Sequence, residues 1–268
     1  MSDNDCNVFY ARNLTEIFYH LKTISALKIV GGCTSIQKMP QKAISTIYVP
    51  ELKTINKHER YIEFGPGTFL SNILALGERN LPKILVDAIK STATPFIRNI
   101  ATIGGNILHD NCQYSLYAPL LALDSSLEFK SPSETTYTSM LNFKQIPEGS
   151  VLTKIRVPLN DWDISIYSRL GPEHQITENT AHFAFLVETD KSIINNLKIA
   201  FAGKLAFRAQ ELENRLLGLR LPLNSKEIAN YVNVAAIQFD KTYENESYPP
   251  VLRQQFLNLI RYSFEQLT

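Results

Sequence analysis

Cysteine is scarce in this sequence of 268 residues, and none of its three cysteines belongs to a C-x-x-C pair. An odd number of distant cysteines predicts neither a disulfide framework nor a zinc knuckle. Iron–sulfur clusters need a full set of closely spaced thiolates, so any such cluster has to come from another chain. The five histidines form no H-x-x-x-H pair, and we assign no metal site.

A strong excess of charge of either sign is also missing. Lys and Arg number 27 against 26 Asp and Glu, a formal net charge of +1 that gives no field to attract nucleic acid or an anionic membrane. No run approaches the roughly 20 apolar residues that span a bilayer. Residues 1–6 are polar and acidic, unlike a signal peptide. We therefore expect a cytoplasmic protein with no nucleic-acid or membrane partner.

Two glycine pairs, set about seventy residues apart, are the most informative feature that is present. They lie in Val30-Gly31-Gly32-Cys33-Thr34-Ser35-Ile36 and in Ala101-Thr102-Ile103-Gly104-Gly105-Asn106-Ile107. Glycine permits positive φ and removes the Cβ, so backbone N–H groups can approach phosphate oxygens. The pairs therefore predict two anion-binding loops, although either pair alone is also compatible with an ordinary turn.

Short helices and strands are expected up to about residue 160. Asn13 and Glu16 have capping-box spacing at the start of the first helix. We expect helices at 13–23, after Thr68, at 83–90 and at 115–123, strands at 27–30, 44–49, 60–64, 127–129 and 151–157, and a polar loop at 131–137.

The pattern changes from about Trp162 onward. Strands are expected at 164–167, 181–187 and 197–201, in a largely antiparallel sheet. Two helices close the chain, one near 208–217 that Gly218 ends and one near 249–264 that begins at a proline. We interpret the whole as an α+β protein in three lobes.

With both glycine pairs placed, the sequence resembles the FAD-binding (medium) subunit of the molybdenum hydroxylases, the family of xanthine dehydrogenase and carbon monoxide dehydrogenase. The family motif P-Q-I-R-N-x-A-T-I-G-G-N-I matches Pro95–Ile107, which reads P-F-I-R-N-I-A-T-I-G-G-N-I. Shorter matches keep the family order over nearly the whole chain, at residues 30–36, 62–68, 120–124, 152–158, 199–203, 208–213 and 248–260.

The resemblance implies a fold and a division into domains. Residues 1–160 would form a two-lobed FAD-binding domain of the PCMH (vanillyl-alcohol-oxidase-like) type, with lobes at about 1–55 and 56–160. Residues 161–268 would form a smaller α+β domain with an antiparallel sheet, like the C-terminal domain of the carbon monoxide dehydrogenase flavoprotein.

The resemblance also implies a cofactor, FAD, with its pyrophosphate on the backbone of residues 31–35 and 102–106. The side chains suit this task because hydroxyl groups stand beside the main-chain donors. Arg98 is either a phosphate ligand or a buried partner that shapes the loop, Cys33 either a reactive thiol or a small filler, and Asn106 either a loop-fixing amide or a helix cap. The expected cofactor contacts are Val30, Gly31, Gly32, Cys33, Thr34, Ser35, Ile36, Ile97, Ala101, Thr102, Gly104, Gly105, Asn106, Ser115 and Arg169.

Two departures from the family pattern affect this site. Ser115 stands where the family often has an Asp that helps to hold FAD. Residues 168–174 replace a more basic stretch near the isoalloxazine, so Arg169 is the only candidate cation at the flavin edge.

The implied function is electron transfer in a xanthine dehydrogenase-like, FAD-dependent oxidoreductase. Its partners would be a large subunit containing molybdopterin and a small subunit with [2Fe–2S] clusters, with NAD as one candidate electron acceptor. We assign no catalytic acid or base to this chain. Two alternatives stay open: a flavin-free scaffold or assembly homologue, and a stand-alone flavin oxidoreductase.

Overall fold

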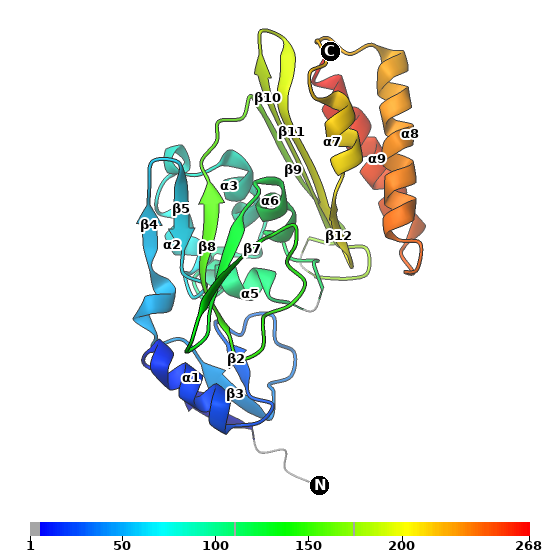
Figure 1. The fold of residues 1–268 in the computed structure, drawn as a ribbon. Helices are drawn as coiled ribbons and strands as arrows, with labels where there is room; N and C mark the ends of the chain where they lie inside the picture. The colour runs from blue at the N-terminus through cyan, green and yellow to red at the C-terminus, as the bar shows by residue number, and fades with distance from the viewer. Residues whose placement is uncertain (1–5, 110, 174) are drawn as a thin grey trace. The chain divides into compact units, whose positions relative to one another are not determined.

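The computed structural model describes residues 6–109, 111–173 and 175–268, and its chain divides into two compact units of mixed helix and sheet (Figure 1). The first unit comprises the residues up to Gly77 together with Thr94–Leu108 and Asp124–Leu159. The second comprises Glu78–Ala93, His109–Leu123 and Asn160–Thr268. Both units are discontinuous in sequence, whereas the division expected at residue 160 follows chain order and stays a prediction.

A small parallel sheet begins the first unit. Its strand order is β1–β3–β2, and helix α1 packs on it through the buried Ile17. The Asn13 side chain caps α1 by accepting the Glu16 N–H at 2.9 Å, while the Glu16 carboxylate accepts the Arg12 N–H at 2.8 Å. The capping prediction is therefore confirmed at the Asn13 end. The bounds are β1 (Asn7–Tyr10), α1 (Leu14–Thr23), β2 (Lys28–Val30) and β3 (Lys42–Ser45).

Strand β3 ends earlier than the sequence predicts. A strand was expected to continue to Val49, but the Val49 N–H donates to the Thr46 carbonyl at 3.0 Å and closes a turn after Ser45. The parallel strands β2 and β3 therefore end at the same edge of the sheet, next to the first glycine pair.

The rest of the first unit contains short helices and a five-stranded antiparallel sheet, in the order β4–β5–β8–β6–β7. The polar loop predicted at 131–137 is wrong in its second half, because Thr135–Ser139 pairs with β6 as the edge strand β7. Strand β7 lies at the edge of the sheet and consists of Thr, Tyr and Ser, so it lacks the alternation of apolar and polar residues by which a strand is predicted from sequence. The bounds are η1 (Pro50–Lys53), β4 (Ile55–Lys57), β5 (Tyr61–Phe64), α2 (Leu70–Leu74), α4 (Pro95–Arg98), α5 (Ile103–Ile107), β6 (Ser126–Lys130), β7 (Thr135–Ser139) and β8 (Val151–Pro158).

The second unit is built on a four-stranded antiparallel sheet, in the order β12–β11–β10–β9. Helices α7, α8 and α9 lie along one side of the sheet and share an aromatic core with it, while α3 and α6 also contact its strands (Figure 1). The expected antiparallel sheet is thus confirmed. The bounds are η2 (Glu78–Asn80), α3 (Lys83–Lys90), α6 (Tyr117–Ala122), β9 (Ile164–Leu170), β10 (Ala181–Asp190), β11 (Ile193–Ala202), β12 (Ala206–Arg208), α7 (Gln210–Leu216), α8 (Ser225–Thr242) and α9 (Pro250–Glu265).

The prediction of only two closing helices is wrong, because α8 lies between the two expected ones. Only five of its 18 residues are buried, namely Ile228, Val232, Val234, Ala235 and Phe239. The sequence does contain a signal for its start. Asn224 and Glu227 form a complete capping box at the first turn.

Candidate functional site

The two glycine pairs lie side by side within the first unit. Strand β2 delivers Gly31 and Gly32, and the chain between α4 and α5 runs directly against them. A Cβ added to Gly32 would lie 1.9 Å from the Ile100 carbonyl oxygen, and one added to Gly31 would lie 3.2 Å from Thr102 Oγ1. No other residue type fits at Gly32 without moving one of the loops.

The glycines are required for close approach and not for an unusual backbone conformation. Positive φ was part of the reason to expect an anion site, yet none of the four glycines in the two pairs has it. The left-handed residue of the first loop is Cys33, with φ of 56°. That part of the prediction is wrong, because the glycines make close contacts without positive φ, and at Gly32 and Gly104 these contacts include main-chain atoms.

The first loop keeps its backbone donors available. Among the described residues, the N–H groups of Gly31, Gly32, Cys33 and Thr34 have no hydrogen-bond acceptor, and Cys33 and Thr34 are exposed. The loop closes after them, where the Ile36 N–H donates to the Cys33 carbonyl at 3.4 Å. Four successive donors on an accessible loop can bind an anion without a basic side chain.

The second loop uses its donors inside the protein. The N–H groups of Ile103 and Gly104 donate to the Thr68 and Pro66 carbonyls at 3.0 and 2.8 Å. The Gly105 N–H donates to Thr102 Oγ1 at 3.1 Å. These N–H groups, expected to bind pyrophosphate, instead fix the loop in place.

Gly104 and Gly105 differ in what surrounds them. A Cβ on Gly104 would lie 2.5 Å from Pro66 Cβ, so this glycine is required by packing. Gly105 is exposed, and a Cβ there would meet only Thr102 Oγ1, at 3.0 Å. Gly105, and not Gly104, is the position where an added Cβ tests access to a ligand.

Thr102 lies at the centre of this arrangement, between Gly31 and Gly105. It is 6% exposed, and its hydroxyl proton has no acceptor among the described residues. Thr102 is also the N-cap of α5, so the cap role considered for Asn106 is wrong. A buried donor aimed at no protein acceptor, beside four available N–H groups, fits a phosphate group.

The other expected contacts in the first unit surround these loops. Val30 and Ala101 are buried, and the Ala101 carbonyl accepts the Leu70 N–H at 3.0 Å. Ile97 is partly exposed on α4, a one-turn helix that also carries Arg98. Ser35 and Ile36 complete the first loop.

Ser115 and Arg169 belong to the second unit. Ser115 is 5% exposed, and its hydroxyl is hydrogen-bonded to that of Thr92. The Arg169 guanidinium donates to the Pro172 carbonyl and to the Gln175 carbonyl at 3.2 Å, within its own β9–β10 loop. His174, which belongs to the departing stretch 168–174, lies outside the described residues.

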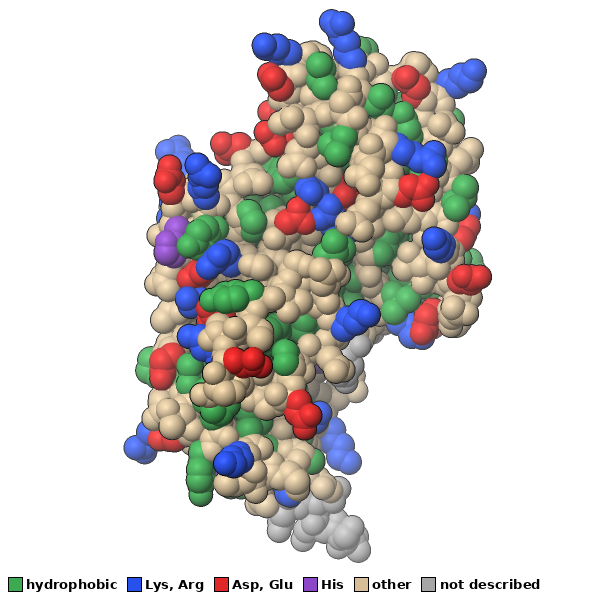
Figure 2. Space-filling model, viewed as in Figure 1, with side chains coloured by type: hydrophobic (Ala, Val, Ile, Leu, Met, Phe, Trp, Pro, Cys, Tyr) green, Lys and Arg blue, Asp and Glu red, His purple; other side chains and the backbone are tan. Residues whose placement is uncertain are grey.

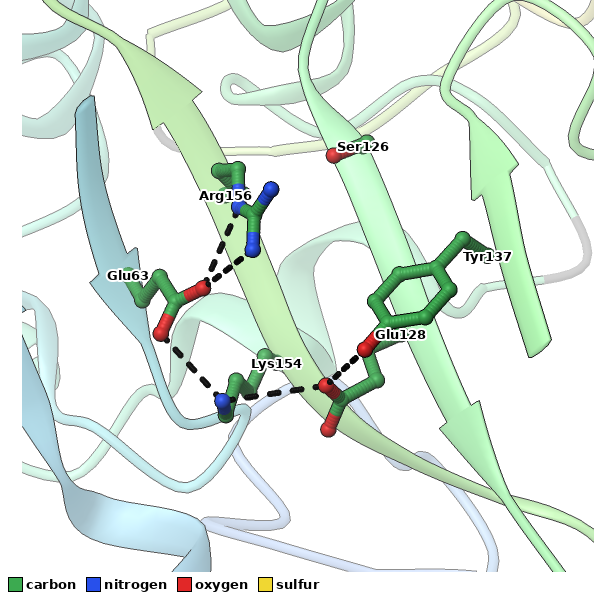
Figure 3. Close-up of a pocket in the computed structure, with 6 residues that line it drawn as sticks. All are labelled: Glu63, Ser126, Glu128, Tyr137, Lys154 and Arg156. Atoms are coloured by element: carbon green, nitrogen blue, oxygen red, sulfur yellow. Dashed lines mark hydrogen bonds and ion pairs between the residues drawn. The ribbon is translucent and has the colours of Figure 1, made fainter. Parts of the chain in front are cut away.

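A closed cluster of charges on the five-stranded sheet was not anticipated from the sequence (Figure 3). Arg156 donates two hydrogen bonds to Glu63 Oε1 at 2.8 and 3.1 Å. Lys154 lies between Glu63 and Glu128, at 3.3 and 3.7 Å, and Tyr137 donates to Glu128 at 3.0 Å. The residues come from strands up to 93 positions apart, so no sequence spacing reveals them.

The electrostatics of this cluster indicate a structural role. Burial opposes ionisation of Glu63, but the hydrogen bonds and charges of Arg156 and Lys154 outweigh it, so its pKa lies below the ordinary value. The pKa of Glu128 is lowered in the same way by Thr153, Tyr137 and two lysines. Carboxylates held ionised and fully paired are poor general bases at neutral pH.

A buried polar network lies within the second unit. The His182 ring, 1% exposed, contacts the Gln113 carbonyl through Nε2 at 3.1 Å and the Tyr167 hydroxyl through Nδ1 at 2.8 Å. A carbonyl only accepts, so Nε2 carries the proton and Nδ1 accepts from Tyr167. Burial lowers the pKa of His182 to about 4, the Gln113 hydrogen bond opposes this, and Arg169 adds to it.

We expect the free energy of unfolding to decrease as the pH falls below about 6.5, the ordinary pKa of histidine. Between this value and the folded pKa of about 4, the unfolded chain binds more protons than the folded chain. The contribution of neutral, buried His182 to the free energy of unfolding is complete above about pH 6.5 and is lost toward pH 4. It amounts to on the order of 3 kcal/mol in total. Urea unfolding across this range checks it. His182→Gln should flatten the profile, and an unchanged slope would contradict the assignment.

Comparison with known proteins adds to this geometry. Residues 4–160 match the family described as the FAD binding domain in molybdopterin dehydrogenase. The chain is 27% identical over 237 residues to indole-3-acetaldehyde oxidase of Zea mays, covering 81% of this chain and 17% of that protein. It is 28% identical over 233 residues to subunit alpha of the 6-hydroxypseudooxynicotine dehydrogenase complex of Paenarthrobacter nicotinovorans, covering 80% of this chain and 77% of that one. The chain thus spans less than a fifth of the maize relative.

Solved structures confirm the expected fold class. Carbon monoxide dehydrogenase from Oligotropha carboxidovorans superposes with a TM-score of 0.83 at 16% identity, covering 100% of this chain and 99% of that chain. The enzyme from Hydrogenophaga pseudoflava gives 0.81 at 19% identity, with 100% and 97% covered.

Residues 6–109, 111–173 and 175–268 contain neither a membrane-spanning helix nor a metal-ligand cluster. No helix in this part of the chain is both long and apolar enough to cross a membrane. Across the same residues, no three His, Cys, Asp or Glu side chains gather as a metal site requires.

Proposed function

Because the chain belongs to the family of FAD-binding domains in molybdopterin dehydrogenases, we propose that it is the flavin-carrying electron-transfer part of a molybdenum hydroxylase. The observation that carries this proposal is the contact between the two glycine loops. It leaves four backbone N–H groups and the Thr102 hydroxyl proton available on one side of the first unit. A pyrophosphate needs this kind of donor set.

Each loop has its own part in the proposed site. The N–H groups of residues 31–34 would hold the pyrophosphate, and Thr102 would donate beside them. The second loop would set the shape of the site, since its own N–H groups are bound to Thr68, Pro66 and Thr102. Ile97, Ser115 and Arg169 stay proposed contacts from the resemblance.

FAD, when bound, supplies redox chemistry that accepts single electrons and passes them on in pairs. The chain's own residues bind and orient the cofactor, and none is proposed to move a proton. We propose a molybdopterin-containing large subunit and a [2Fe–2S] small subunit as partners, with NAD as the candidate acceptor and the cytoplasm as the location. The name of the Paenarthrobacter relative, a subunit of a dehydrogenase complex, supports an assembly of several chains.

A flavin-free scaffold is the second candidate, and a specific observation favours it. Ser115 is hydrogen-bonded to Thr92, and Arg169 is bound to carbonyls of its own loop, so both expected contacts of the second unit already have protein partners. The absorption spectrum of the purified chain separates the candidates. Maxima at about 375 and 450 nm support the flavoprotein, and a colourless chain that takes up no added FAD would refute it.

Gly105→Ala is expected to weaken FAD binding by about tenfold or more, because its Cβ would occupy the space a phosphate approaches. The fold should tolerate it, since the Cβ meets only the Thr102 hydroxyl, at 3.0 Å. Titration of the apoprotein by flavin fluorescence measures the effect. Gly203→Ala is the matched control, because its Cβ would meet the Tyr243 hydroxyl at 3.3 Å in the second unit. Equal FAD affinity in both variants would argue against the pyrophosphate assignment.

A further inference from the structure

The polar network of the second unit holds Gln113 against residues 177–182, the end of the β9–β10 loop and the start of β10. The main-chain carbonyl of Gln113 accepts from His182 Nε2 at 3.1 Å. Its side-chain nitrogen donates to the carbonyls of Thr177 and Thr180, at 2.6 and 3.1 Å. Both protons of the side-chain amide are therefore used, and Gln113 is only 8% exposed.

His182 is hydrogen-bonded through both of its ring nitrogens, to Gln113 on one side and to Tyr167 on the other. Its Nδ1 accepts from Tyr167, whose hydroxyl lies 2.8 Å from that of Ser91 at the end of α3. The rings of Tyr167 and His182 are nearly parallel, with 15° between their planes. The network thus links the end of α3, the segment before α6, and the β9–β10 hairpin, all within one compact unit.

The segments that it fixes are those that carry the expected flavin contacts of this unit. Ser115 follows Gln113 by two residues and is bound to Thr92, whose hydroxyl also donates to the Ala88 carbonyl at 2.9 Å. Arg169 is the cross-strand partner of His182 in the β9–β10 ladder. Its guanidinium and the Gln113 amide bind carbonyls of the same loop, residues 171–180.

We propose that His182 and Gln113 are positioning residues for the cofactor of this chain: they fix the backbone on which Ser115 and Arg169 stand. This inference rests on the proposed FAD function. A buried histidine whose two ring nitrogens are both hydrogen-bonded fixes two segments in one relative position, which an apolar residue of the same volume cannot do. Neither residue is proposed to touch the reacting atoms.

The test measures FAD dissociation constants and melting temperatures of the full chain. His182→Leu removes both ring hydrogen bonds and should weaken FAD binding by about tenfold. His182→Gln can donate to the Gln113 carbonyl and accept from Tyr167, so it should restore binding to within about threefold of the unaltered chain. Gln113→Leu should weaken binding as His182→Leu does.

Phe183→Leu is the matched control, because Phe183 is the next residue of β10 and packs in the helix-covered core against Phe256. It should lower the melting temperature and leave FAD affinity unchanged. If His182→Leu does not fold, Tyr167→Phe removes a single hydroxyl and should still weaken binding by about twofold or more.

The outcomes separate the two proposals. An unaltered chain that does not bind FAD overturns both the proposed function and this inference. An unaltered chain that binds FAD, with His182→Leu or Tyr167→Phe equal to it in affinity, overturns the positioning role alone. The positioning role is also overturned if His182→Gln does not restore FAD binding, or if Phe183→Leu weakens FAD binding as much as His182→Leu does.

Discussion

Gly32→Val is expected to abolish FAD binding and to lower the free energy of unfolding by about 2–4 kcal/mol. The added Cβ would lie 1.9 Å from the Ile100 carbonyl oxygen, well inside contact distance. That backbone cannot retreat easily, because the N–H groups of Ile100 and Ala101 both bind the Ile97 carbonyl, at 3.0 and 2.7 Å. The loops would have to separate, and the donors of the first loop would leave Thr102. Equilibrium dialysis with FAD and urea unfolding measure the two effects.

Gly31→Ala provides the control for this substitution. Its Cβ would meet only the end of the Thr102 side chain, 3.2 Å from Oγ1, which can shift by a few tenths of an ångström. We expect a stability change below about 1 kcal/mol for it. A Gly32→Val chain with full stability and stoichiometric FAD would refute the contact between the loops.

Glu213→Leu is expected to destabilise the second unit by about 3–5 kcal/mol. The Glu213 and Arg208 side chains are only 4% and 5% exposed. Glu213 Oε1 accepts from Arg208 Nε at 3.0 Å and from the Ile199 N–H at 2.8 Å. Removal of the carboxylate leaves a buried guanidinium and a buried N–H without their acceptor. Urea unfolding at neutral pH measures the loss.

Two comparisons make this prediction specific. Glu211→Leu removes an exposed i,i+4 partner of Arg215 and should cost about 0.5 kcal/mol or less. The double substitution Arg208→Met with Glu213→Leu removes both buried charges and should recover most of the loss, since a buried ion pair contributes little beyond what an apolar pair provides. A loss below about 1 kcal/mol in Glu213→Leu alone would contradict the buried-pair interpretation.

The Arg208–Glu213 pair shows what a sequence pattern can predict and what it cannot. The family motif R-A-x-x-x-E is visible at residues 208–213, and the sequence places it at the start of a helix. That the two ends of the motif form a buried ion pair, and that the glutamate also binds β11, depends on the sheet beside the helix. Local patterns predicted most helices and strands because each has an apolar side or a cap. They missed the short elements β1, β4, β12, α4 and α5, the mostly polar strand β7, and α8, in which only five of 18 residues are buried.

The candidate site was predictable in its location and only partly in its chemistry. The two glycine pairs are plain in the sequence, but which backbone donors remain available depends on Pro66 and Thr68, which lie more than thirty residues away from Gly104. The longer motif around the second glycine pair favoured the second loop as the main phosphate-binding loop. The structure leaves the available N–H groups on the first.

The crowding around the glycines has a genetic consequence. The obstacle at Gly32 is a carbonyl oxygen, as it is at Gly65, where a Cβ would lie 2.4 Å from the Leu52 oxygen. Every residue type has the same carbonyl, so no second mutation in a facing side chain can make room. At Gly31 and Gly105 the obstacle is the Thr102 side chain, which Thr102→Ala would shorten. A search for suppressors of lost stability should therefore find them for alanine at Gly31 or Gly105 and never for valine at Gly32 or Gly65, whereas FAD binding should not return with Thr102→Ala, which removes a proposed phosphate donor.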